Sequence, residues 1–241
     1  MSNLKFSKQM SESIKLGVIL AIAGGFMDAY SYMCRGKVFA NAQTGNILLF
    51  GIYMSERQWN ILLLGINISE RNWHMALHYL VPVLAFAIGI ALADLVKIRT
   101  KNLTLLHWRQ ISVFCEAVIL LSVSFIPQDF NLVANALTSL ACGIQVESFR
   151  KIHGNGIATT MCIGNLRSAT QHMCSYANTK DKEYIKKGLL YYGIIFFFVI
   201  GAVIGNACVE MFAEKALLIA SAILAVAFVM MFVDGEKEQC K

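Results

Sequence analysis

A carboxyl group stands inside an apolar segment of this chain, at a position where it could bind a proton or a cation. Asp28 lies in GGFMDAYSYM, and the apolar run that follows carries uncharged polar side chains. This first polar set is Asn41, Gln43, Thr44, Gly45 and Asn46. An ionisable residue at membrane depth is costly, so it faces a bundle interior or a water-filled cavity and indicates a functional site. The alternative is that Asp28 hydrogen-bonds the next element, as polar side chains between membrane helices often do.

A second polar set occurs in the other half of the chain. It consists of Thr159, Thr160, Gly164 and Asn165. Hydroxyl and amide groups supply hydrogen-bond donors and acceptors, and glycine permits a tight turn or a close backbone approach. A non-helical turn at membrane depth must be buried in protein or line water. We therefore expect each set to form a short re-entrant or broken element whose residues are candidates for binding a solute or a proton.

Two further acids are candidates for the same role. Glu116 has no basic residue four positions away and could join Asp28 in one internal polar network. Glu147 is close enough to Arg150 and Lys151 to pair with them at helical spacing, which is the simpler interpretation. The chain carries no hydrolase, metalloprotease or phosphate-binding motif and no Cys-x-x-Cys pair. We therefore predict no catalytic residue, no metal ligand and no cofactor.

The composition is that of a polytopic membrane protein. Hydrophobic residues make up 57% of the 241 residues and charged residues only 15%, with a mean hydropathy of +0.58. An average globular domain has roughly 25% charged residues. A soluble chain of this length can bury a core, but it does not need several apolar runs of about 20 residues, the length that crosses the hydrocarbon layer.

Six apolar segments are expected to span the membrane as helices. They are 14–34, 76–97, 110–126, 130–149, 187–209 and 216–233. The two polar sets fall in shorter segments, 38–54 and 156–176. The first of these would reach only about 25 Å as a helix, so a full span is doubtful and a re-entrant element is favoured.

The distribution of basic residues supports six spans over eight. Lys and Arg collect in cytoplasmic loops. Six spans with both termini in the cytoplasm place most of the 21 Lys and Arg residues inside, whereas eight spans divide them almost equally. The net charge of +6 then belongs to flanks that face anionic lipid, and no nucleic-acid partner is needed.

The chain also resembles itself. A shift of 119 residues places Gly24 over Gly143 without a gap, and the same shift places Asn46 over Asn165. A second block agrees at a shift of 112, where FAIGIALAD lies over FVIGAVIGN. We interpret the chain as two repeats.

The repeats cover about 1–127 and 128–241. Each contains three spans and one re-entrant element, and an odd number of spans makes the second copy enter from the opposite face. This all-α, inverted-repeat arrangement is typical of transporters and channels.

The same motifs indicate a family. GGFMDA followed by FANAQTGNILLFG, with GIQ, ATT and GN in the second half, resembles the YoaK-like bacterial inner-membrane proteins, a family with a domain of unknown function. The residues that fit the family pattern are Gly25, Asp28, Ala29, Phe39, Asn41, Thr44, Gly45 and Asn46. Val146 and Ile163 depart from it, since the family usually has Asn and Thr there. The resemblance implies a protein of roughly six spans in the bacterial inner membrane, with no established activity.

Three functions remain open from the sequence. The first is a transporter or channel for a small polar solute or ion, with a path between the repeats past Asp28. The second is a membrane scaffold or assembly protein whose polar residues are structural. The third is an intramembrane enzyme that uses Asp28 and Glu116 as an acid pair. The expected partners are the lipid bilayer and the solute, and a homo-oligomer is compatible with each function.

Overall fold

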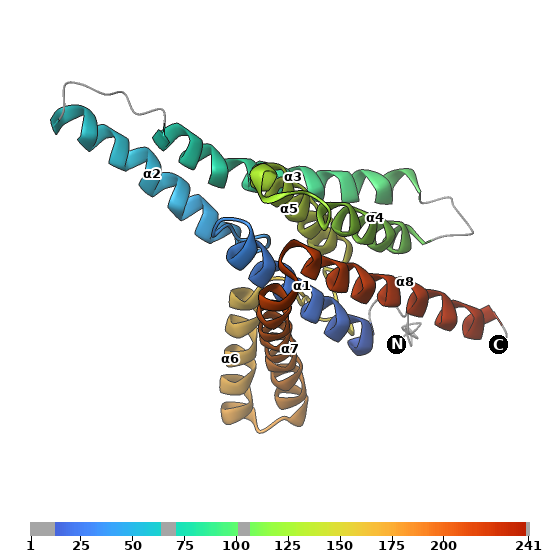
Figure 1. The fold of residues 1–241 in the computed structure, drawn as a ribbon. Coiled ribbons are helices and arrows are strands. Elements are labelled where there is room, and N and C mark those ends of the chain that lie inside the picture. Colours follow the sequence, from blue (N-terminus) through green and yellow to red (C-terminus); the bar gives the residue numbers. More distant parts are fainter. Residues whose placement is uncertain (1–12, 64–70, 101–106, 240–241) are drawn as a thin grey trace.

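The computed structural model describes residues 13–63, 71–100 and 107–239. Side chains are described for these residues except in 55–75 and 233–239. The described part is helical and contains no β-strand (Figure 1). Its α-helices are α1 (Ile14–Cys34), α2 (Gln43–Leu63), α3 (Arg71–Arg99), α4 (Trp108–Val123), α5 (Asn131–Ser148), α6 (Cys162–Thr179), α7 (Lys182–Phe212) and α8 (Leu217–Gln239). Short 3₁₀ helices, η2 (Gln128–Phe130) and η3 (Ala213–Ala216), precede α5 and α8.

Three helical stretches of the described chain are long and apolar enough to cross a bilayer. They are Ile14–Cys34, Ala76–Arg99 and Lys182–Phe232, the last of which contains α7 and most of α8. Apolar side chains are also exposed along one side of α3, at Leu77, Leu84, Ile88, Leu92 and Leu95. Such a stripe is unfavourable in water and is satisfied by lipid tails.

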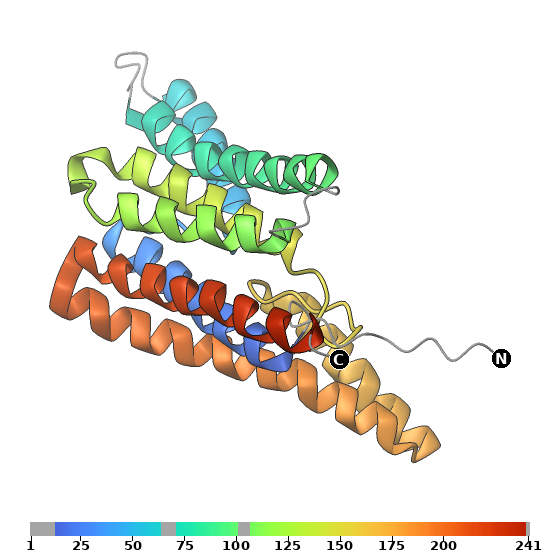
Figure 2. The ribbon, with the colours of Figure 1, turned by 90° about the vertical axis from the view of Figure 1, so that its right-hand side faces the viewer.

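The first helix of each half packs with helices of the other half. Contacts join α1 to α7 and α8, and they join α5 to α3 and α4. Figure 2 shows the two groups, α1 with α7 and α8 below, and α3 with α4 and α5 above. The two groups meet through α4 and α8 and through α1 and α5.

Glycines allow the closest of these helix contacts. A Cβ atom on Gly25 would overlap the backbone carbonyl of Phe198, and one on Gly201 would overlap that of Ile22. The same relation holds in the other group, where Gly89 and Gly143 face each other across α3 and α5. Small residues at these crossings let the backbones approach, which is how membrane helices gain van der Waals contact.

Helices α1 and α5 run in opposite directions. Arg35, directly after α1, donates a hydrogen bond to Asn131 at the start of α5. Near the other ends, the Gln145 side chain of α5 donates to the carbonyl of Leu20 in α1. Helices α4 and α8 are antiparallel as well, since Phe114 packs on Phe228 while Ala117 accepts a hydrogen bond from Ser221.

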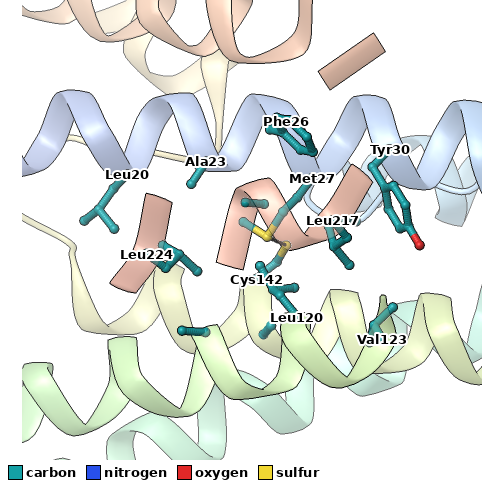
Figure 3. Packing of buried hydrophobic residues seen from close by; sticks show 14 of the residues in the cluster. Leu20, Ala23, Phe26, Met27, Tyr30, Leu120, Val123, Cys142, Leu217 and Leu224 are labelled. Carbon is teal, nitrogen blue, oxygen red and sulfur yellow. Dashed lines mark hydrogen bonds between the residues drawn. The ribbon is translucent and has the colours of Figure 1, made fainter. Parts of the chain in front are cut away.

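The apolar core lies where α1, α4, α5 and α8 converge. Met27 of α1 and Cys142 of α5 meet at its centre, with 3.7 Å between their sulfur atoms (Figure 3). Leu120 of α4 and Leu224 of α8 close the same cluster and are fully buried or nearly so. This core fixes the relative position of α1 and α5, the two helices that carry the candidate site.

The helices that contain part of each polar set extend beyond the segments predicted for the short elements. In place of a unit over 38–54, residues after Arg35 form a loop and α2 then continues to Leu63. In place of 156–176, α6 begins at Cys162 and ends at Thr179. The prediction ended the first element where hydropathy falls, but the Glu, Arg and Gln residues that follow at 56–58 are good helix formers, so α2 continues past the apolar run.

Candidate functional site

The loop after α1 folds back along α1 itself. The Asn41 backbone N–H donates to Asp28 Oδ1 at 2.7 Å, and the Asn41 side chain donates to the carbonyl of Gly24 at 3.0 Å. Gly24 lies in the middle of α1, ten residues before Cys34 ends it. The loop therefore returns to the level of mid-helix, and α2 starts beside the middle of α1.

Asp28 holds this loop. Its carboxylate accepts the backbone N–H of Asn41. Ser31 strengthens the arrangement, because its hydroxyl accepts the N–H of Ala40. Two successive backbone N–H groups of the loop are thus held by side chains of α1. The contacts agree with the structural interpretation of Asp28.

The first polar set braces the same loop. Asn46 binds both backbone groups of Phe39, accepting its N–H at 3.0 Å and donating to its carbonyl at 2.7 Å. Asn46 also donates to the Gln43 side chain, whose own amide donates to the carbonyl of Ala40. Gly45 lies against the Phe39 ring, where a Cβ atom would come within 2.9 Å. The side chains of this set are thus mainly occupied by the loop.

The second loop is braced by an equivalent pair. Asn165 accepts the N–H of Ala158 at 3.2 Å and donates to its carbonyl at 2.6 Å. This is the contact that Asn46 makes with Phe39, again between residues seven positions apart. Sequence reasoning placed both asparagines in equivalent elements, and the structure gives them the same local hydrogen bonds.

The tips of the two loops meet on α1. Gly24 accepts the Asn41 side chain from the first loop. A Cβ atom built on Gly24 would lie 3.2 Å from the Thr159 carbonyl and from the Thr160 methyl group of the second loop. Gln145 joins the second loop to this place, since its side chain donates to Leu20 and to the Thr159 hydroxyl at 3.2 Å.

Three side-chain oxygens at this meeting point have no hydrogen-bond partner in the described part of the chain. They are Asn41 Oδ1, Gln145 Oε1 and Thr160 Oγ1. All three residues are at most 2% exposed. Buried polar atoms are normally paired, so these oxygens mark a place that a polar ligand or water can satisfy.

Glu116 is also buried and unpaired. The residue is fully buried in α4, and neither carboxyl oxygen has a hydrogen-bond partner among the described residues. No hydrogen bond in the described regions links Glu116 to Asp28, so the expected polar network does not extend between the two acids as a direct contact.

Three predicted residues lie away from the loop tips. Glu147, at the end of α5, pairs with Arg150 at 3.2 Å and with Lys97 at 3.9 Å. Thr44 and Gly164 are exposed at the starts of α2 and α6. Helix geometry explains this, because successive residues of a helix point about 100° apart and only some members of each polar set can face α1.

Two residues of the structure were missed by the sequence analysis. Gln145 interrupts an apolar run and was not weighed, although an amide in a predicted span is itself a signal. Arg35 follows an apolar segment and was not considered as a site residue, yet it is fully buried. Its guanidinium donates to Tyr30 at 2.8 Å and to three carbonyls at the end of α4, those of Val123, Ile126 and Pro127. A charge directly after an apolar helix resembles an interfacial residue, so no local signal distinguishes it.

No group of three His, Cys, Asp or Glu side chains within the described ranges could hold a metal ion. The free side chains of the meeting point are two amide oxygens and a hydroxyl. They can orient or bind a polar molecule by hydrogen bonds.

Comparison with known proteins agrees with the resemblance seen in the motifs. Residues 16–230 match a family described as a protein of unknown function, DUF1275. The chain is 23% identical over 196 residues to the UPF0700 transmembrane protein YoaK of Bacillus subtilis (strain 168), which covers 77% of this chain and 79% of that protein. No solved structure matches the chain. The YoaK-like resemblance is thereby confirmed.

Proposed function

The chain belongs to the DUF1275 family and is a membrane protein, and we propose that it is a channel or transporter for a small solute. Its path would run between two inverted repeats, past the tips of the two loops. The observation that carries the proposal is the meeting of both tips on Gly24, beside three buried oxygens without partners. Non-helical backbone at membrane depth occurs where it is buried in protein or lines a cavity, and transporters place their binding sites between such broken elements.

The helix contacts support an inverted repeat. Exchanging the halves turns the α1–α7 contact into the α5–α3 contact, and the α2–α3 contact into the α6–α7 contact. The contact between α4 and α8 is unchanged by the exchange. The antiparallel arrangement of α1 and α5 also supports copies that are opposite in direction. Six spans predict this relation, whereas eight spans require α1 and α5 to be parallel.

The proposed orientation places the N-terminus of α1 in the cytoplasm. The ends of α3 and α5 then lie on the cytoplasmic side, where Lys97, Arg150 and Glu147 form ion pairs. Arg35 and Lys37 lie on the outer side with the end of α1. This arrangement follows the positive-inside rule. The chain termini themselves, residues 1–12 and 240–241, lie outside the described residues.

A second candidate function is a membrane scaffold. It is favoured by the contact of Asp28, whose carboxylate accepts a backbone N–H and needs no solute. For the same reason an enzyme based on Asp28 and Glu116 is not part of our proposal. The first acid is engaged by its own loop, and no hydrogen bond in the described chain joins it to the second.

The test is solute permeation through proteoliposomes that contain the purified full-length protein. Vesicles are shocked with a panel of osmolytes in a stopped-flow instrument, and their re-swelling by light scattering is compared with that of protein-free vesicles. The panel contains uncharged solutes, monovalent cations and monovalent anions. Protein-dependent entry of any of them supports a channel or transporter. Equal rates with and without protein for every solute would favour the scaffold.

A further inference from the structure

We propose that Asn41, Gln145 and Thr160 form a binding site for a small uncharged solute that donates hydrogen bonds, such as an amide or a polyol. The inference rests on the proposed function and names its class of substrate. It uses the three oxygens without partners and the fixed orientation of the groups that carry them.

The three side chains lie beside one turn of α1, between Leu20 and Gly24. Asn41 donates to the carbonyl of Gly24, and Gln145 donates to that of Leu20, one turn earlier. Thr160 has its methyl group against Gly24. The site therefore combines residues of α1, α5 and both loops.

The hydrogen bonds fix which end of each amide is free. Gly24 and Leu20 offer carbonyl oxygens, which only accept, so Asn41 and Gln145 must turn their NH₂ groups toward them. The oxygens Asn41 Oδ1 and Gln145 Oε1 are then left as acceptors. Thr160 Oγ1 carries a hydroxyl that both donates and accepts. A ligand that satisfies the site must donate at least two hydrogen bonds.

The surrounding charges favour an uncharged ligand. Oδ1 of the Asp28 carboxylate already accepts the Asn41 backbone N–H, so it offers less to a cation. Helix α6 begins next to Thr160 without a side-chain cap, and this positive end of the helix dipole disfavours a cation. Two fixed acceptor oxygens disfavour an anion. A neutral molecule with N–H or O–H groups fits both constraints.

The decisive variant is Thr160→Val, because valine has the shape of threonine without the hydroxyl. Thr160 Oγ1 makes no hydrogen bond within the described chain, so its removal should leave thermal stability in detergent equal or higher. The matched control is Thr138→Val, which removes a buried hydroxyl of α5 that bonds its own helix at Ala134. Thr160→Ser keeps the hydroxyl and should bind the solute as the wild-type protein does.

The probes are urea, an amide, and glycerol, a polyol, in the stopped-flow permeation assay. We expect at least one of these solutes to permeate vesicles that contain the wild-type protein. Thr160→Val should slow its permeation about tenfold, because one hydrogen bond to the solute is lost. Thr138→Val should leave the permeation rate unchanged. Normal permeation in Thr160→Val would overturn this site while the proposed channel stands. Selective passage of sodium or chloride would overturn the solute class, and lower stability of Thr160→Val would show a structural hydroxyl. A wild-type protein that passes nothing in the panel ends both proposals.

Discussion

The carboxylate of Asp28 accepts the backbone N–H of Asn41 at 2.7 Å, thirteen residues further along the chain. This contact ties the C-terminal half of α1 to the loop that returns beside it. It determines where α2 begins, and it places the Asn41 side chain against Gly24. Asp28 therefore stabilises the loop that follows its own helix.

Asp28→Asn is expected to destabilise the protein. An asparagine oxygen can still accept the Asn41 N–H, but this hydrogen bond is weaker without the carboxylate charge. The expected loss is about 1–3 kcal/mol, measured by thermal unfolding in detergent. Asp94→Asn is the control, because that exposed pair with Lys97 is worth at most about 1 kcal/mol. Unchanged stability in Asp28→Asn would contradict the structural role of the carboxylate and return it to solute binding.

Gly201→Ala is expected to separate α1 from α7. The new methyl group would overlap the backbone of Ile22, which cannot move away as a flexible side chain could. Overpacking of this kind costs about 1–3 kcal/mol. Gly193→Ala, in the same helix with no atom within 4 Å of its Cβ position, should be neutral or stabilising. Equal melting temperatures for the two variants would show that α1 and α7 do not pack as described.

Arg35→Lys is expected to weaken the junction of α1, α4 and α5. Arg35 uses a planar fork to reach Tyr30, Asn131 and three carbonyl groups, whereas a lysine has three donors on one atom. Carbonyls left without a donor should lower the free energy of unfolding by at least about 2 kcal/mol. Arg150→Lys, on the exposed ion pair with Glu147, serves as the control in the same thermal assay. A tolerant Arg35 position would mean that water reaches these carbonyls.

The direction of the two repeats can be tested by cysteine labelling. Lys37→Cys and Lys151→Cys, each in a cysteine-free background, place one exposed thiol after α1 and one after α5. We expect a membrane-impermeant maleimide to label the first in intact cells and the second only after permeabilisation. Labelling of both from outside would indicate that α1 and α5 cross in the same direction, and would favour eight spans.

Much of the fold could be predicted because long apolar segments identify membrane-spanning helices. The span predicted at 14–34 has the same bounds as α1. Each of the other five predicted spans coincides with one helix. At each end that helix either extends beyond the predicted span or falls short of it by at most three residues. The ends of α2 and α6 could not be predicted this way. Residues 55–60 of α2 are mostly polar, so hydropathy ended the first element there while the helix continues to Leu63.

The candidate site was predicted in part. Asp28, Asn41, Thr159 and Thr160 lie at or beside the meeting of the loops, as the polar sets suggested. Gln145 completes the place from α5 and was missed, since one amide in an apolar run gives no partner by itself. Glu147 aligns with Asp28 in the repeat, yet it lies in an ion-pair cluster because Lys97 and Arg150 are nearby in space.

The sequence by itself determined that this is a helical membrane protein of the DUF1275 family, with two similar halves that each carry a polar element. Composition, the length of apolar segments and sequence motifs can be evaluated without any knowledge of how the helices pack. Only the tertiary structure decided that Asp28 binds its own loop, that Arg35 is buried, and that both loop tips meet on Gly24. The last of these facts depends on which helices cross, and contacts such as those of Gly25 with Phe198 and of Gln145 with Leu20 join segments more than 100 residues apart in sequence.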